Sequence, residues 1–352
     1  MLDELESIAA NLRLSYSNER QSDVPRFVKG IYEEIEQRRL RTPNDTAAFL
    51  LELQSYGATL FRSLLPQQVQ RALWQHRDAI ESILLLSTET HVPWELVHIC
   101  DPDTGMLPDA RCFLADKGLV RWLHNTQVQP ETIAVHAGKV RHIVPDYPAA
   151  QWKLPATKRE LDFLIARFDS RSVGDAAADL YAMLTGNADF DLLHFAGHGE
   201  AQGDDIEDAA ILMLGRVAAA QWSPDRAKAL VVRSLPQGAG AHARPFVFLN
   251  ACQVGRAGQV VGTIGGFAAA FLARGAGAFV APLWAVGDQP AFDFGEALYR
   301  GFFHEGLTLS AASTAARRAA ATAGDATWLA YAVYGHHDAR AQVDGALAPR
   351  WG

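Results

Sequence analysis

The sequence predicts an α/β protein, with a mostly parallel central sheet flanked by helices and a helical region at the N-terminus. In the second half of the 352-residue chain, short apolar runs alternate with segments of helical periodicity, an order typical of a parallel sheet. The apolar runs are not interrupted by alternating polar residues, which indicates strands that helices cover on both faces. The first part of the chain shows helical periodicity alone.

The N-terminal region is expected to be helical from residue 1 to about residue 75. In the segment RFVKGIYEEIEQRRL, the side chains of Phe27, Ile31 and Ile35 recur every four residues among charges and form one apolar stripe. The segment 45–75 continues this pattern. We therefore expect two parts, a helical region of residues 1–75 that packs on a larger domain of residues 76–352.

The later elements are predicted in order from the same signals. Thr157 and Glu160 form a capping box at the start of one helix, and Gly186 ends the next. Strands are expected at 131–138, 190–196, 245–250, 277–284 and 328–335. Helices are expected at 157–168, 175–186, 223–235, 262–275, 291–306 and 308–324.

Composition argues against a nucleic-acid-binding, membrane or disulfide-rich protein. Lys and Arg total 32 against 40 Asp and Glu, a net charge of −8, so no direct contact with nucleic acid or an anionic membrane is expected. The longest apolar stretches are broken by charge and glycine, and the acidic N-terminus does not resemble a signal peptide. Three cysteines without a paired metal-ligand spacing predict a cytoplasmic protein with no disulfide scaffold, no metal and no cofactor.

One histidine and one cysteine fall where an α/β sheet gathers its functional groups, at the carboxyl ends of the strands. His198 follows the strand expected at 190–196, and Cys252 follows the strand expected at 245–250. If these strands are neighbours, about 4.8 Å apart, the imidazole and the thiol can face each other. A nearby histidine can then take the thiol proton and return it to a leaving amine.

The glycines around the histidine fit the same chemistry. Gly197 and Gly199 are expected to let the backbone bend tightly around His198. The backbone amides of Gly199 and Cys252 can then both point at a developing oxyanion.

Structural interpretations account for the other candidate residues. His194 is expected to be a core histidine, and Cys100 and Cys112 are expected to be inert buried thiols. The spacing of His194 and His198 suits zinc only on a helix, and this segment is strand-like. The segment GRAGQVVGTIGG (255–266) has no Lys-Ser/Thr ending, so helix-entry and packing glycines explain it better than a phosphate-binding loop.

Four sequence blocks resemble the CHAT family of caspase-like cysteine proteases, in the caspase/separase clan. The blocks are DLLHFAGHGEA, VFLNACQVG, GAFVAPLWAVGDQ and WLAYAVYG. The upstream segment ILLLSTETHVPWELV is similar to the early block of that family, so the resemblance covers roughly residues 76–340. It implies a caspase-haemoglobinase-like sheet with His198 as general acid/base, Cys252 as nucleophile, and the amides of Gly199 and Cys252 as oxyanion donors.

The resemblance also implies a setting. Relatives of this family commonly carry repeats or a sensor domain, and some act in bacterial antiviral defence. This chain has no recognisable repeat array, so control by a separate activator or regulator protein, or by processing, is implied.

Asp288 is a candidate for the pocket that receives the substrate residue before the cut. It lies four positions after Trp284 in a stretch similar to the W-x-V-x-D block of separases, where an acidic side chain receives a basic residue. Metacaspases, which are also basic-specific, carry an Asp two positions before the nucleophile, where this chain has Asn250. The alternative is that Asp288 caps the helix that begins near Gln289.

The resulting functional hypothesis is a cysteine endopeptidase that cuts a specific protein partner in a regulated bacterial defence or cell-death pathway. The alternative is a catalytically inactive caspase-fold interaction module. A small-molecule α/β enzyme is disfavoured, because the sequence has no cofactor fingerprint.

Overall fold

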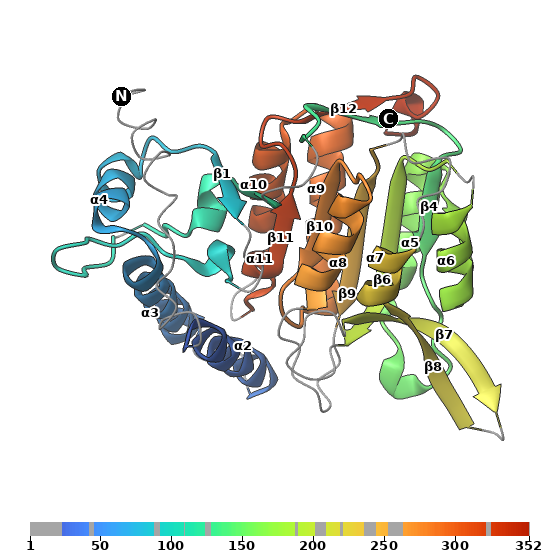
Figure 1. Ribbon diagram of the computed structural model, residues 1–352, viewed down its shortest axis with the longest axis horizontal. Coiled ribbons are helices and arrows are strands. Elements are labelled where there is room, and N and C mark those ends of the chain that lie inside the picture. The colour runs from blue at the N-terminus through green and yellow to red at the C-terminus, as the bar shows by residue number, and fades with distance from the viewer. Residues whose placement is uncertain are drawn as a thin grey trace.

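The fold is seen in a computed structural model, which describes residues 23–41, 46–87, 92–108, 110–123, 128–186, 189–200, 209–218, 221–235, 244–252, 263–321 and 325–351. Three helices come first: α2 (Asp23–Arg41), α3 (Thr46–Leu64) and α4 (Gln67–His76). The expected helical region is thus confirmed over these residues, and residues 1–22 lie outside the described ranges. Figure 1 shows the three helices beyond the β1 edge of the central sheet.

A ten-stranded sheet forms the centre of the molecule, in the order β1-β2-β11-β10-β9-β6-β4-β5, with β7 pairing with β6 and β8 pairing with β7. The strands are β1 (Ile83–Ser87), β2 (Leu119–Leu123), β4 (Val140–Ile143), β5 (Arg171–Ser172), β6 (Leu192–Glu200), β7 (Ala210–Ala218), β8 (Gln221–Lys228), β9 (Phe246–Cys252), β10 (Ala278–Pro282) and β11 (Tyr331–Tyr334). All neighbours along the main path are parallel except β10 and β11. The prediction of a mostly parallel sheet is confirmed.

Helices cover both faces of this sheet. They are α5 (Pro155–Phe168), α6 (Ala177–Thr185), α7 (Ala229–Ser234), α8 (Thr263–Ala273), α9 (Asp288–Tyr299), which continues as a π-helical turn to His304, α10 (Leu309–Ala320) and the short α11 (Thr327–Ala330). Tyr299 of α9 packs on Phe248, and Phe271 of α8 packs on Phe279. Because Phe248 pairs with Val280, the neighbour of Phe279, these two contacts lie on opposite faces.

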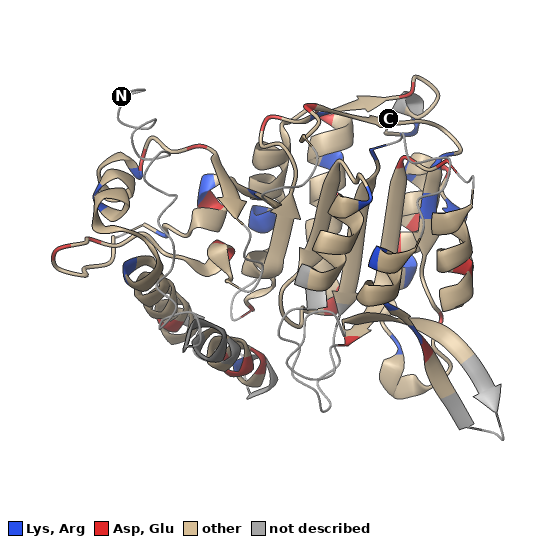
Figure 2. Ribbon diagram, in the orientation of Figure 1, with Lys and Arg blue, Asp and Glu red and all other residues tan. Residues whose placement is uncertain are grey.

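The buried strands are apolar, and the charges lie mainly elsewhere. Figure 2 shows the central strands almost entirely free of charged residues, with acidic and basic residues spread over the helices and loops. Of the helices in the described ranges, none is both long and apolar enough to cross a membrane. The thiols of Cys100 and Cys112 are free and buried, as the sequence predicts.

The N-terminal helices and the sheet share one hydrophobic core. Gly57 of α3 lies against the carbonyl of Leu96, where a Cβ atom at position 57 would come within 2.1 Å of the carbonyl oxygen. This close approach requires glycine, because the obstacle is backbone and cannot move aside. Residues 23–76 therefore pack closely against the sheet domain. The domain boundary expected between residues 75 and 76 stays a prediction.

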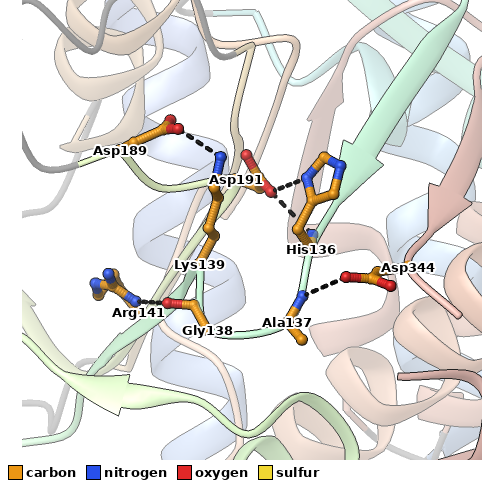
Figure 3. A network of polar contacts seen from close by, with 8 residues as sticks. All are labelled: His136, Ala137, Gly138, Lys139, Arg141, Asp189, Asp191 and Asp344. Atoms are coloured by element: carbon orange, nitrogen blue, oxygen red, sulfur yellow. Dashed lines mark hydrogen bonds and ion pairs between the residues drawn. The ribbon is translucent and has the colours of Figure 1, made fainter. Parts of the chain in front are cut away.

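A polar network fixes the amino ends of the strands, at the edge opposite the expected site (Figure 3). The Asp191 carboxylate accepts from the backbone N–H of His136 at 2.8 Å and lies 2.6 Å from Nδ1 of the same residue. The carbonyl of Asp191 accepts from Phe246 N, so the entry to β6 is joined to the entry to β9. Asp344, which follows β12 (Arg340–Val343), contacts Ala137 N; β12 pairs with β3 (Thr132–Val135) in a separate two-stranded sheet.

Three local predictions of secondary structure were wrong. Residues 328–330, expected as the start of a strand, lie in the short helix α11, and the strand β11 begins only at Tyr331. Residues 223–228, expected as the first half of a helix, belong to the hairpin of β7 and β8, and only Ala229–Ser234 is helical. The chain stays extended there because β8 completes the antiparallel ladder of β7, a tertiary pairing that overrides the local helical signal. The capping box is also absent, since α5 begins at Pro155 and Glu160 turns into the core.

The buried imidazole of His98 makes the stability of the fold depend on pH. Burial lowers its pKa from 6.5 to about 4, and its Nε2 accepts from Cys112 N at 3.0 Å. As the pH falls, a histidine with a depressed pKa in the folded state becomes protonated in the unfolded chain before it becomes protonated in the folded protein. Protonation therefore stabilises the unfolded chain relative to the folded protein. We therefore expect the free energy of unfolding to fall by about 3 kcal/mol from this residue as the pH drops from 6.5 to about 4.

Urea unfolding at several pH values checks this expectation. His98→Gln should have a shallower loss of stability below pH 6.5 than the wild type. The same substitution at the exposed His304 should leave the wild-type slope unchanged. Equal slopes for wild type and His98→Gln would contradict the assignment.

Candidate active site

The structure brings together the two strands that carry the candidate dyad. β6 and β9 are parallel neighbours, and in their register His198 is the Cα partner of Cys252. Both residues lie within their strands, close to the carboxyl ends. β6 extends to Glu200 and β9 extends to Cys252, so both strands are longer than the expected ends at 196 and 250. For Cys252 the structure describes the backbone, and its thiol lies outside what is described.

The His198 ring is held in a defined orientation. Its Nε2 lies 2.8 Å from the carbonyl oxygen of Trp152, and because a carbonyl only accepts, Nε2 carries the hydrogen. The edge of the Trp152 ring packs on the imidazole, with centroids 5.1 Å apart and the planes at 85°. In the neutral ring, Nδ1 is therefore the nitrogen that can take up a proton.

The backbone of His198 is fixed by a second aromatic residue. The hydroxyl of Tyr147 accepts from His198 N at 3.0 Å and donates to the carbonyl of Leu212 at 2.6 Å. This hydroxyl thus joins the end of β6 to β7. Tyr147 also packs on the imidazole ring, with centroids 4.9 Å apart.

Gly197 serves a different purpose from the one expected. The expected bend around His198 is wrong, because β6 continues as a strand through Gly197 and Gly199 to Glu200. Instead, a Cβ atom at position 197 would lie 2.7 Å from the hydroxyl of Tyr147. Glycine is therefore needed to let that hydroxyl approach the strand. Gly199 pairs with Ile211 of β7 in the antiparallel part of the ladder.

A buried polar cluster lies beneath the dyad on the same two strands. His194 is fully buried, with Nδ1 2.7 Å from the Tyr299 hydroxyl and Nε2 2.8 Å from Oε1 of Glu160. The same Glu160 oxygen accepts from the Asn250 side chain at 2.8 Å. His194 is thus a core residue with polar partners, as expected of it, and Asn250 is turned inward to the core.

Asp288 lies near the dyad but does not cap its own helix. It is the first residue of α9, and its carboxylate accepts from Ala156 N at the start of α5 at 2.8 Å. The alternative that it caps the helix near Gln289 is therefore wrong, since the capped helix is α5. Burial raises the pKa of the Asp288 carboxyl, as does the charge of Glu160, while the Ala156 N–H and His198 act to lower it. These influences place Asp288 within electrostatic reach of His198.

Three residues around the candidate dyad were not predicted as part of the site from the sequence: Tyr147, Trp152 and Glu160. Tyr147 and Trp152 belong to the segment VPDYPAAQWKLP, which follows β4. Because β4 is the parallel neighbour of β6, its carboxyl end lies at the same sheet edge. The rule that located His198 and Cys252 would have located this segment, had the short strand VRHI been recognised.

The arrangement can support attack by a thiol on a carbonyl group. Because Nε2 of His198 donates its hydrogen to a backbone carbonyl, Nδ1 is the ring nitrogen that can act as a general base. The paired strand ends place a cysteine at the register position beside it. Backbone amides at a strand end are suitable donors to an oxyanion.

Comparisons with known proteins agree with the family that the sequence blocks resemble. A model of the CHAT domain family matches residues 54–336. A search of curated proteins found no match. Among solved structures, the Arg-specific cysteine proteinase gingipain R is similar over 92% of this chain and 76% of its own, at 11% identity and a TM-score of 0.44.

Two further solved structures are similar. The complex of Porphyromonas gingivalis RgpB pro- and mature domains matches over 92% of this chain and 78% of its own, at 10% identity and a TM-score of 0.45. Separase from the Saccharomyces cerevisiae separase–securin complex matches over 72% of this chain, at 17% identity and a TM-score of 0.39. This chain spans 15% of the length of that separase.

Proposed function

The chain belongs to the CHAT domain family, and we propose that it is a cysteine endopeptidase in which His198 and Cys252 form the catalytic dyad. The observation that carries the proposal is the pairing of these two residues across β6 and β9. It is supported by the orientation of the imidazole, which the Trp152 carbonyl fixes through Nε2.

The proposed reaction proceeds in two stages. Nδ1 of His198 takes the thiol proton, and the Cys252 sulfur attacks the scissile carbonyl carbon, while the amides of Gly199 and Cys252 donate to the oxyanion. The carbon–nitrogen bond then breaks as His198 returns the proton to the leaving amine. In the second stage His198 deprotonates a water molecule, which attacks the thioester and releases the free thiol and the carboxylate product.

The substrate and the setting are also part of the proposal. A protein substrate follows from an endopeptidase activity. The CHAT family resemblance supports a cytoplasmic enzyme in a regulated bacterial defence or cell-death pathway. The alternative function, an inactive interaction module of the same fold, predicts that no peptide bond is cut.

Loss of Cys252 should abolish hydrolysis. We expect Cys252→Ala and His198→Ala each to lower kcat/KM by at least about 1,000-fold, because members of a catalytic pair act as a unit. The assay uses the full chain with a pool of fluorogenic peptides. Cys100→Ala and Cys112→Ala are matched controls, because burial raises the pKa of both thiols and keeps them unreactive.

Three outcomes of that assay are distinguishable. Cleavage that requires both residues supports the dyad. Cleavage that persists in Cys252→Ala would rule the mechanism out. A folded wild-type chain that cuts no peptide, alone or with its activator, would favour the interaction module.

For a separate regulator, we propose a route through the N-terminal helices, because α2 contacts the loop that precedes Asp288. Glu36 of α2 accepts from Ala285 N at 3.1 Å, and Tyr32 of α2 packs on Trp284, with ring centroids 5.5 Å apart. Both contacts are on the loop that leads from β10 to Asp288. A protein that binds α2 can therefore act on the side of the site that Asp288 occupies.

We accordingly expect the purified chain alone to be a weak protease that host-cell extract activates. Cleavage of a peptide pool is compared with and without extract, and Cys252→Ala in the same extract corrects for other proteases. Full activity of the purified chain on unrelated unfolded proteins would count against a regulator.

We further propose that Asp288 receives a basic substrate residue. Asp288→Asn is the informative variant, because an amide oxygen can still accept from Ala156 N while the charge is lost. We expect this variant to keep its melting temperature and to lose preference for Arg or Lys before the cut by about 10-fold, as a charge-assisted hydrogen bond becomes a neutral one.

Cleavage of a peptide library by the wild type and Asp288→Asn measures that preference. Asp293→Asn makes the same change of charge five residues further along α9 and should leave the preference unchanged. A preference for acidic residues in the wild type, or the same basic preference in Asp288→Asn, would remove Asp288 from the pocket.

A further inference from the structure

Glu160 is a buried carboxylate that the proposed mechanism does not use. It lies on α5 with 5% of its surface exposed, although its sequence context predicts a solvent-facing cap. Charged side chains are rarely buried to this extent unless they have partners. Oε1 of Glu160 accepts a hydrogen bond from the side-chain amide of Asn250 at 2.8 Å. The same oxygen lies 2.8 Å from Nε2 of His194, in a close polar contact that is not aligned as a hydrogen bond.

These two partners belong to the two strands of the dyad. Asn250 is two residues before Cys252 on β9, and His194 is four residues before His198 on β6. In the register of the two strands, Asn250 pairs with Ala196, so the contacts lie directly beneath the dyad. One carboxylate oxygen therefore joins both strands to the same helix.

Asn250 and His194 each have a second buried polar contact, with a tyrosine hydroxyl. The hydroxyl of Tyr331 on β11 donates to the side-chain oxygen Oδ1 of Asn250 at 2.7 Å. The hydroxyl of Tyr299 lies 2.7 Å from Nδ1 of His194, and burial raises the pKa of this phenol well above its ordinary value, so it stays protonated. Neither the amide nor the imidazole can therefore turn without breaking a buried contact.

The packing around the carboxylate leaves it little freedom. A Cβ atom at Gly295 of α9 would lie 3.5 Å from Oε1 of Glu160 and 3.2 Å from the Phe248 ring. Glycine at position 295 thus lets α9 close over the cluster. The N-terminal end of the same α5 helix follows Trp152, whose carbonyl holds the His198 ring.

We propose that Glu160 is a positioning residue for the dyad: by holding Asn250 of β9 and His194 of β6 to α5, it fixes the placement of Cys252 relative to His198. The inference rests on the proposed function, because it assigns a use to that dyad. It predicts that the acceptor oxygen matters more than the negative charge, since the Asn250 amide requires an acceptor at this point.

Alkylation of Cys252 by iodoacetamide at pH 7 tests the proposal without requiring peptide cleavage. The full chain is used, and mass spectrometry gives the rate at Cys252 separately from the buried Cys100 and Cys112. We expect Glu160→Ala to slow alkylation by about 10-fold, because a thiol displaced from its histidine loses thiolate character. Glu160→Gln should restore the rate to within about 2-fold of the wild type, because its amide oxygen still accepts from Asn250.

Leu164→Ala is the matched control, one turn further along α5, fully buried and without polar contacts to either strand. It should lower the melting temperature through a cavity while leaving the alkylation rate unchanged. If Glu160→Ala does not fold, Glu160→Asp replaces it, because the shorter side chain draws the carboxylate away from Asn250 while keeping the charge. We expect Glu160→Asp to slow alkylation as well.

The outcomes separate this proposal from the proposed function. Slow alkylation in Glu160→Ala or Glu160→Asp together with recovery in Glu160→Gln supports a positioning role. Wild-type rates in every folded Glu160 variant would overturn it, even if their melting temperatures fall. A wild-type chain that alkylates rapidly but cuts no peptide would instead refute the endopeptidase activity and leave the positioning result intact.

Discussion

Parallel pairing of β6 with β9 places His198 beside Cys252, and most of the surrounding structure maintains that register. A slip of one residue would pair His198 with Ala251 and would reverse the face of every side chain along the strand. The register is fixed at the far edge through Asp191, whose carbonyl accepts from Phe246 N. Near the dyad it is fixed by the contacts of Glu160 with Asn250 and His194.

Helix α5 and the segment before it connect three parts of the site. The Trp152 carbonyl orients the His198 ring, and Ala156 N donates to the Asp288 carboxylate. Glu160 contacts Asn250 of β9 and His194 of β6. These contacts all come from residues 152–160, so one short segment of the chain supports the His198 ring, the Asp288 carboxylate and the two strands. This arrangement explains how a residue at the start of α9 can lie within reach of the dyad while serving as a cap for another helix.

Much of the fold was predictable because buried parallel strands leave an unmistakable pattern of uninterrupted apolar residues. That pattern located β6, β9 and β10, and the rule of carboxyl strand ends located His198 and Cys252. Short strands such as β4 lack the length to be recognised, so Tyr147 and Trp152 were missed. Glu160 was misassigned because a local cap and a tertiary contact both suit a glutamate in the first turns of a helix, and only the approach of β9 decides between them.

The proposed chemistry depends on activation of the Cys252 thiol by His198. The most direct test is the pH dependence of Cys252 alkylation in the wild type and in His198→Ala. We expect the thiolate to form well below the ordinary pKa of about 8.5 in the wild type and close to that value in the variant. Identical profiles in the two proteins would show that His198 does not activate the thiol.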